Sequence, residues 1–174
     1  NSSSSIINKS TPSTALVINN KFITWGYEVP KKPRFIDTII LHSSYNIGAN
    51  PYSLNGVLLE FKKYGVSAHY IIDRDGNIYR LVPDKYIAYH AGVSKMPDGR
   101  VNVNPFSIGI EMIYKNTESP NDLQYNSLAK LVKYLESLYH IKYILGHYQI
   151  APDRKTDPWN FSISKLRVLI DSLK

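Results

Sequence analysis

The chain has 174 residues, a length that fits one domain whose core needs no disulfide or structural metal. It contains no cysteine, which excludes disulfides and cysteine-ligated zinc. The net charge of +7 favours anionic partners, but the basic residues are scattered in ones and twos and form no recognisable nucleic-acid-binding motif. We therefore expect no nucleic-acid partner.

The N-terminal part of the chain differs in composition from the rest. It begins "NSSSSIINKS", without Met or a signal-peptide pattern, as expected of a processed or trimmed product. Residues 1–30 are expected to form an extension or linker. Within them, 1–14 are rich in Ser, Asn and Thr, and 15–26 alternate around Asn19-Asn20 in a way that suggests a hairpin. The compact domain is expected at 31–174, as a monomer without a membrane span.

The first half of this domain shows three elements. Residues 35–42 are β-branched and apolar, which predicts a buried strand ending at His42. Residues 53–65 predict a helix capped by Ser53 and closed by Gly65. Residues 67–82 predict a hairpin that turns at Asp75-Gly76.

The second half continues the alternation of strands and helices. Residues 107–113 predict a strand, and apolar residues at steps of three and four predict an amphipathic helix from about Asp122 to Tyr139. A strand at 142–147 again ends in a histidine, and a last helix is expected at about 162–173. This order predicts a single α/β domain with a central mixed sheet flanked by helices.

Two predicted strands end in histidine, His42 and His147. Ligands of α/β sheets gather at the carboxyl ends of strands, and Asp157 follows His147 by ten residues across a turn-rich loop. Two imidazoles and one carboxylate are a common ligand set for catalytic zinc. Considered alone, however, a histidine at a strand end is more often an ordinary surface or core residue, and the compact HExxH pattern is absent.

Two further polar residues stand in informative places. Glu111 interrupts the apolar strand "SIGIEMI", where a carboxylate is costly unless it is paired, functional or exposed on a half-buried strand. Lys155 lies two residues before Asp157 and is either an ordinary loop lysine or part of the same site.

A set of segments gives these residues a context. In chain order, "LHSSYN", "SAHYIIDRDGNIYRLVPD", "YHAGVS", "NPFSIGIEM" and "GHYQIAPDRKTDPWNF" resemble the zinc-dependent N-acetylmuramoyl-L-alanine amidases of the amidase-2 group. The resemblance covers about residues 35–170. It implies hydrolysis of the amide bond between N-acetylmuramic acid and L-alanine in peptidoglycan or muropeptides, with Zn²⁺ as cofactor.

The resemblance also implies roles for individual residues. His42, His147 and Asp157 match the zinc ligands, and Lys155 matches a lysine that stabilises the oxyanion. Glu111 matches the glutamate that serves AmpD-like members as general base; the T7-lysozyme-like branch uses a tyrosine where this chain has Ala68. The residues that match the substrate site are Tyr89, His90, Ala91, Asn104 and Arg154.

Some positions depart from the family pattern or leave alternatives open. Tyr89 replaces the usual Trp, and the segment 93–106 differs from known family versions. His69 is either a supporting residue of the metal site or a packed core histidine. The resemblance further implies a secreted or cell-wall-associated protein, although phage lysins and cytoplasmic muropeptide recycling fit it too.

Three rival functions remain to be weighed against an amidase. A non-catalytic peptidoglycan-binding module of the same fold is the nearest, and an intact Asp157 with Lys155 argues against it. An iron oxygenase would usually carry a close His-x-Asp/Glu pair, which is absent. A basic nucleic-acid binder lacks any supporting motif.

Overall fold

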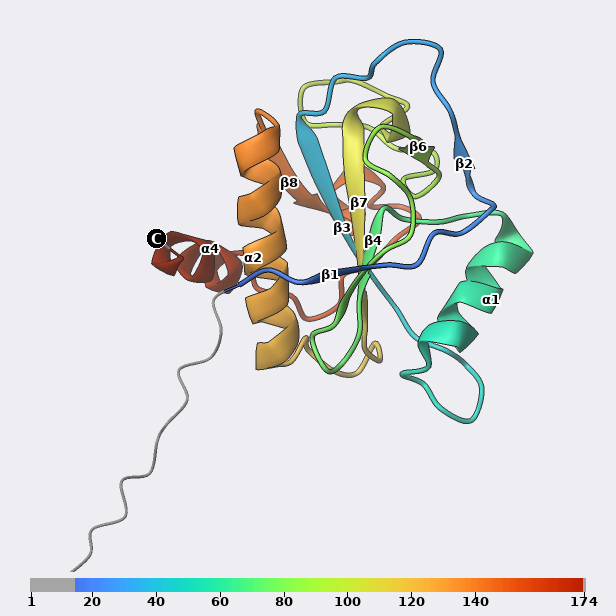
Figure 1. Ribbon diagram of the computed structural model, residues 1–174, viewed down its shortest axis with the longest axis vertical. Helices are drawn as coiled ribbons and strands as arrows, with labels where there is room; N and C mark the ends of the chain where they lie inside the picture. The colour runs from blue at the N-terminus through green and yellow to red at the C-terminus, as the bar shows by residue number, and fades with distance from the viewer. Residues whose placement is uncertain (1–14, 174) are drawn as a thin grey trace, which may run out of the picture.

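The structure, a computed structural model, describes residues 15–173 (Figure 1). A six-stranded mixed sheet lies at its centre, in the order β1-β5-β4-β7-β3-β8, and a two-stranded ribbon pairs β2 with β6. The strands are β1 (Ile18–Asn20), β2 (Tyr27–Glu28), β3 (Thr38–Ser44), β4 (Tyr70–Ile72), β5 (Ile78–Arg80), β6 (Ile87–Ala88), β7 (Ser107–Ile113) and β8 (Tyr143–Gly146). The helices are α1 (Leu54–Tyr64), η1 (Asn104–Phe106), α2 (Asp122–Leu138), α3 (His147–Ile150) and α4 (Ile163–Ser172). The predicted α/β domain with a mixed central sheet is confirmed.

The middle of the sheet is parallel. Strand β3 pairs in parallel with β7 on one side and β8 on the other, and β4 extends the parallel set beyond β7. Every residue of β7 is buried, which fits a strand covered by other elements on both faces. The carboxyl ends of β3, β7 and β8 therefore meet at one edge of the sheet, where the site lies.

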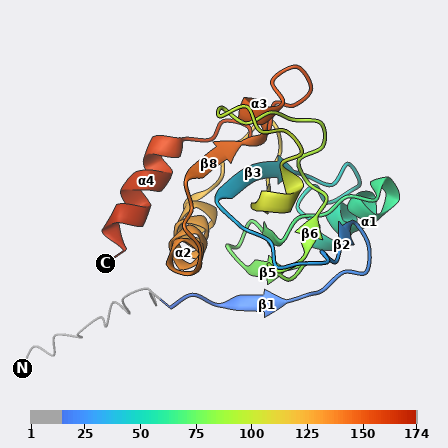
Figure 2. The same ribbon diagram turned by 90° about the horizontal axis from the view of Figure 1, so that it is seen from above.

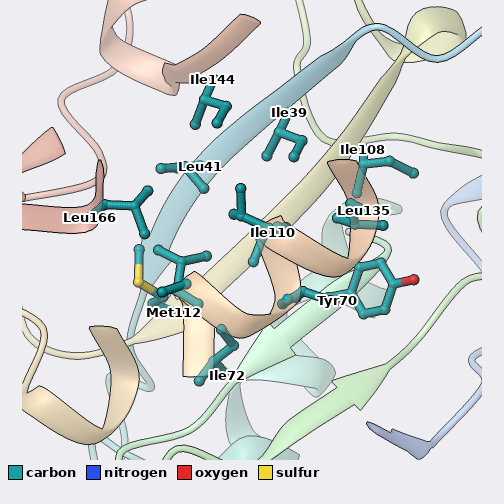
Figure 3. Packing of buried hydrophobic residues seen from close by; sticks show 14 of the residues in the cluster. Ile39, Leu41, Tyr70, Ile72, Ile108, Ile110, Met112, Leu135, Ile144 and Leu166 are labelled. Atoms are coloured by element: carbon teal, nitrogen blue, oxygen red, sulfur yellow. The ribbon is translucent and has the colours of Figure 1, made fainter. Parts of the chain in front are cut away.

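Successive side chains of the central strands point to opposite faces of the sheet, and one of these faces is apolar. Figure 3 shows Ile39 and Leu41 of β3 beside Ile110 and Met112 of β7, packed with Leu135 of α2. This face is covered by α2 and α4, which lie together on the same side of the sheet (Figure 2). The remaining residues of each strand must point to the opposite face.

The opposite face carries both apolar packing and polar chemistry. Val57 and Phe61 of α1 pack there against Ile71 and Ile113, and Figures 1 and 2 show α1 on the side away from α2. His42 and Glu111 belong to this face, since each is one residue away from a side chain that points to α2.

The predicted helix boundaries are close to those observed. The Ser53 side chain accepts a hydrogen bond from the backbone of Gly56 and so caps α1, and Gly65 closes that helix with a left-handed φ of 64°. Asn121 begins α2 through a capping box with Gln124. The expected turn at Asp75-Gly76 joins β4 to β5, with Gly76 at φ +80°.

Three expectations need correction. The hairpin around Asn19-Asn20 is wrong, because Ile18–Asn20 pairs in parallel with Ile78–Arg80 as an edge strand. The strand that carries His42 runs on to Ser44, and His147 begins α3 rather than ending β8. Periodicity along the chain does not reveal which distant strand a short segment joins.

The N-terminal segment from residue 15 onward packs on the domain. Ile23 is buried with α1, and the rings of Tyr27 and Tyr86 stack 5.6 Å apart. Residues 1–14 lie outside the described residues, and the boundary at residue 30 stays a prediction. Within residues 15–173, no helix is long and apolar enough to cross a membrane.

Candidate metal centre and active-site cleft

Three side chains from distant parts of the sequence converge at the carboxyl edge of the sheet. His42 comes from β3, His147 from the start of α3, and Asp157 from the loop before α4. The Nδ1 atoms of the two histidines are 3.0 Å apart, and each lies 3.3 Å from the Asp157 carboxylate. Among the described residues, this is the one group of three metal-ligating side chains with converging ligand atoms.

Backbone geometry and a backbone hydrogen bond position His147 and Asp157. The chain turns at Gly146, where an added Cβ would lie only 2.5 Å from the Tyr148 ring, and α3 starts immediately afterwards. The backbone N–H of Tyr148 donates to the carbonyl of Asp157 at 2.9 Å, which ties the Asp157 loop to α3. The nine residues between His147 and Asp157 therefore form a closed loop.

The donor set fits a divalent metal such as zinc. The Nε2 atom of His147 donates to the carbonyl of Ala91 at 2.9 Å, so the neutral ring leaves a lone pair on Nδ1. Nδ1 of His42, Nδ1 of His147 and a carboxylate oxygen of Asp157 thus face a common point. A cation bound at that point would be stabilised by all three. Tetrahedral zinc with bonds of about 2.0–2.1 Å places its ligand atoms roughly 3.3 Å apart, close to the separations observed here.

The protonation states of these residues suit metal binding. Burial lowers the pKa of His42 to about 4, which keeps its imidazole neutral at physiological pH. Burial alone would raise the pKa of Asp157, but the proximity of the His147 and His42 rings outweighs burial and holds that pKa well below the ordinary value. A neutral imidazole and an ionised carboxylate are the forms that bind metals.

Glu111 lies beside His42 in a different environment. Its carboxylate is 8% exposed and accepts a hydrogen bond from the Ser44 hydroxyl at 3.1 Å. Burial, followed by the negative charge of Asp157, raises the pKa of Glu111 to about 8, while Ser44 and Lys155 act in the opposite direction. The pKa values of the two carboxylates are thus shifted in opposite directions, which fits an ionised metal ligand at Asp157 and a group that exchanges protons at Glu111.

Two cations stand at the rim of the site, both exposed. The charge of Lys155 lowers the pKa of both His42 and Glu111, which shows that it acts on the same locus. Arg154 is partly committed to the fold, because its Nη2 donates to the carbonyls of Ala91 at 3.1 Å and Val93 at 2.6 Å.

These residues open into a cleft of about 670 Å³. The sequence resemblance placed five residues in the substrate site, and all of them line this cleft: Tyr89, His90, Ala91, Asn104 and Arg154. The opposite wall, from α1 and the turn after it, was missed. Its residues are Glu60, Phe61, Tyr64, Val66 and Ser67. The exposed aromatic Tyr64, 65% exposed near the end of an amphipathic helix, was the available signal.

His69 does not line this cleft, and the segment 93–106 borders it through Asn104. His69 is fully buried, accepts from the backbone N–H of Gly109 at 3.1 Å, and has no contact with His42 or His147, which makes it a packed core histidine. The segment 93–106 forms a small closed loop in which Met96 and Val103 are buried against Ile150. The departure from the family pattern is therefore a packed part of the domain.

The fold brings three metal-ligating side chains together at the carboxyl edge of a mixed sheet, and comparison with known families gives the class of the protein. The family model for N-acetylmuramoyl-L-alanine amidases (Amidase_2) matches residues 31–160. The chain belongs to this family.

Individual relatives are similar over the same region. The 1,6-anhydro-N-acetylmuramyl-L-alanine amidase AmpD of Escherichia coli K12 is 46% identical over 108 residues, which make up 60% of this chain and 58% of that protein. A crystal structure of a selenomethionine AmpD derivative superposes with a TM-score of 0.72 at 30% identity, covering 90% of this chain and 97% of that one. The amidase AmiD of E. coli, in complex with a muropeptide substrate, gives a TM-score of 0.68 at 25% identity over 82% of this chain and 60% of that one.

Proposed function

We propose that this protein hydrolyses the amide bond between N-acetylmuramic acid and L-alanine in peptidoglycan or in muropeptides derived from it, with Zn²⁺ as cofactor. The observation that carries the proposal is the His42–His147–Asp157 cluster, which shares one cleft with Glu111 and Lys155. The chain spans little more than half the length of the curated AmpD relative, so its activity rests on this site rather than on the comparison.

His42, His147 and Asp157 would hold the metal through Nδ1, Nδ1 and a carboxylate oxygen. When bound, zinc lowers the pKa of water and polarises a carbonyl oxygen, the two things that hydrolysis of an unreactive amide needs. Three protein ligands leave a further position for water or substrate, which is the arrangement of catalytic rather than structural zinc sites.

Glu111 is the residue placed to move the proton. Ser44 occupies Oε2, so Oε1 is the oxygen that takes a proton from the attacking water. The oxygen of that water joins the carbonyl carbon of the lactyl group, and the carbon–nitrogen bond then breaks. Glu111 returns the proton to the departing nitrogen of L-alanine. In the metal-free protein burial raises the pKa of Glu111 to about 8, and a cation bound beside it would lower that pKa towards the range in which one carboxyl group both accepts and returns a proton.

Lys155 and Arg154 supply positive charge at the rim. The ammonium group of Lys155 would stabilise the negative charge that develops on the carbonyl oxygen of the substrate. Arg154 has two nitrogens held by the carbonyls of Ala91 and Val93, and its Nη1 makes no hydrogen bond to the described residues. That nitrogen is oriented to bind a carboxylate of the stem peptide.

The substrate class agrees with the name of a structural neighbour. AmiD was crystallised with the substrate anhydro-N-acetylmuramic acid-L-Ala-D-gamma-Glu-L-Lys, whose lactyl amide is the bond proposed here. The positive net charge suits a wall rich in acidic groups. This substrate class fits a secreted or wall-associated location, with a phage lysin and cytoplasmic muropeptide recycling as the alternatives.

A non-catalytic binding module of the same fold is the alternative. Such a module needs neither a complete ligand set nor a buried carboxylate beside it. The presence of Asp157 at 3.3 Å from both histidines, with Glu111 next to His42, favours the enzyme.

The test is a digest of purified peptidoglycan and of a soluble muropeptide, analysed by mass spectrometry with and without a chelator. We expect free stem peptides with a new L-alanine amino terminus and uncut glycan strands, and we expect activity to be lost on chelation and restored by Zn²⁺. New reducing sugar ends, or cleavage between stem residues, would contradict the proposed bond. Binding of the substrate without any product would establish the non-catalytic alternative.

A further inference from the structure

The side chain of His90 lies behind the metal site and has both ring nitrogens occupied. It is 8% exposed, although it borders the cleft. Its Nδ1 is 2.9 Å from Nε2 of His42, and its Nε2 is 3.0 Å from the hydroxyl oxygen of Ser107. Both of its polar atoms are therefore used within the protein.

The direction of these hydrogen bonds follows from the last acceptor in the series, the backbone carbonyl of Val103. The Ser107 hydroxyl lies 2.8 Å from the carbonyl of Val103, and a carbonyl can only accept, so Ser107 donates its single proton there. The Ser107 oxygen must then accept from Nε2–H of His90. A neutral His90 protonated on Nε2 has a lone pair on Nδ1, so His42 must donate from its own Nε2.

This series of hydrogen bonds determines which ring nitrogen of His42 is free to bind a metal. With its proton on Nε2, His42 presents the lone pair of Nδ1 to Asp157 and His147. A backbone carbonyl thus fixes the tautomer of a metal-binding residue through two intervening side chains. Such orientation of a ligand histidine by a hydrogen-bonded partner raises metal affinity.

The fold holds His90 in this position from two sides. The Asn104 side-chain oxygen accepts from the backbone N–H groups of His90 at 3.2 Å and Ala91 at 2.9 Å. Gly109 on β7 leaves room for the ring, since an added Cβ would lie 2.6 Å from Cγ of His90. The carbonyl of Ala91 orients His147, so the same short segment controls both histidines.

We propose that His90 is a positioning residue that fixes the tautomer of His42 for metal binding, with Ser107 as its anchor, and that it makes no contact with substrate. This inference rests on the proposed metal site. It changes the role that the sequence resemblance implied for His90, which was substrate binding.

The test compares His90→Leu, His90→Asn and Ser107→Ala with the wild type. Zinc affinity is measured by competition with a chelator. His90→Leu removes the acceptor for His42 and should weaken zinc binding roughly 10- to 100-fold. Asn places its Oδ1 on the same branch point as Nδ1 of histidine, so His90→Asn should bind within a few-fold of the wild type. Ser107→Ala, nearly isosteric, should show a smaller loss, because His90 is then free to change tautomer.

Two further readouts separate positioning from other roles. At saturating zinc, His90→Leu should lower kcat with KM unchanged and His90→Asn should stay close to the wild type, whereas a substrate contact would raise KM in both and overturn the proposal. In the metal-free protein at about pH 8, above the usual imidazole pKa of about 6.5, ¹⁵N NMR should show His42 protonated on Nε2 in the wild type. A proton on Nδ1 would overturn it.

The control is Val93→Ala, which shortens an 85% exposed side chain near the same segment and should leave zinc affinity unchanged. Equal zinc affinity of His90→Leu and the wild type, with both folded, would also refute the proposal. If the wild type binds no zinc, the proposed function fails, and the NMR tautomer of His42 still decides the inference.

Discussion

His42 and Glu111 are partners in the register of two neighbouring parallel strands, β3 and β7. Paired positions point to the same face of a sheet, so the imidazole proposed to bind the metal and a buried carboxylate lie side by side on two central strands. Because both strands lie in the middle of the sheet, neither residue can move far without disturbing the core. We infer that the distance between metal and general base is set by the sheet itself.

The first prediction concerns catalysis by Glu111. Glu111→Gln keeps the shape and the hydrogen bond to Ser44 but cannot take up a proton, so we expect a loss of about 100- to 10,000-fold in kcat. Zinc content and melting temperature should stay close to wild type. Turnover of a muropeptide and metal analysis of the same sample measure both effects. A variant with near wild-type kcat would show that another group moves the proton.

The second prediction concerns the stability of the metal-free protein between about pH 4.5 and pH 8. The folded pKa of Glu111, about 8, lies above its ordinary value of 4.5, so the folded state binds the extra proton. Its contribution to stability is complete below pH 4.5 and is lost as the pH rises towards 8. Glu111→Gln removes this dependence. Urea unfolding should therefore show the variant gaining stability over the wild type as pH rises, and a constant difference would contradict the shifted pKa.

The third prediction concerns the loss of folding stability of the metal-free protein as the pH falls. Burial lowers the pKa of His42 to about 4 and that of His69 to about 3, and the pKa of His90 falls well below 6.5. The unfolded chain takes up protons at these residues first, so stability is present above pH 6.5 and is lost as the pH falls through this window. Each histidine contributes a slope of up to about 1.4 kcal/mol per pH unit.

The measurement for this third prediction is unfolding of the metal-free protein between neutral and acidic pH, together with proton uptake on unfolding. Glu111 opposes the histidines within this range, so the Glu111→Gln variant should show the steeper loss. Absence of proton uptake near pH 5.5, about one unit below the imidazole pKa, would mean that these histidines are not buried neutral.

Local sequence patterns predicted some elements of the fold and missed others. Helices α1 and α2 carry caps and apolar periodicity, so Ser53, Gly65 and the start at Asp122 followed from local chemistry. Strand β1 has three residues and pairs with a segment sixty positions away, a pairing that depends on tertiary packing and that no local pattern encodes.

The site residues were found by two different signals. His42, Glu111 and His147 stood out as polar residues at or near the ends of apolar strands, and the resemblance supplied their roles. The hydrogen-bond order through His90 and Ser107 was not predictable, because it depends on ring orientations set by Asn104 and Gly109. Spacing along the chain carries no information about tautomers.

The fourth prediction concerns the N-terminal segment. Deletion of residues 1–14 should leave melting temperature and activity nearly unchanged, because their composition cannot bury a core. Deletion of residues 1–28 removes β1 and exposes the pocket of Ile23, whose burial contributes about 1.5–3 kcal/mol. We expect a fall of several degrees in melting temperature for the longer deletion. Equal stability of the two deletions would show that residues 15–28 contribute nothing.

The last prediction concerns the charge at the rim of the cleft. Lys155 forms no ion pair among the described residues, yet its charge acts on both His42 and Glu111. This position beside the proposed metal ligands motivates the proposed role of Lys155 in stabilising negative charge that develops during the reaction. Lys155→Met keeps the length of the side chain but removes the ammonium group, and we expect kcat to fall about 100- to 1000-fold with a small change in KM.

Lys133→Met is the matched control for this substitution, because it removes the same charge from the exposed face of α2, on the other side of the sheet. It should lower the net charge equally and leave kcat unchanged. If both variants lose activity to the same extent, the effect belongs to the overall charge and to attraction of an acidic substrate, which salt would screen. If Lys155→Met raises KM at constant kcat, Lys155 binds the ground state, and stabilisation of the oxyanion must come from another group in the cleft.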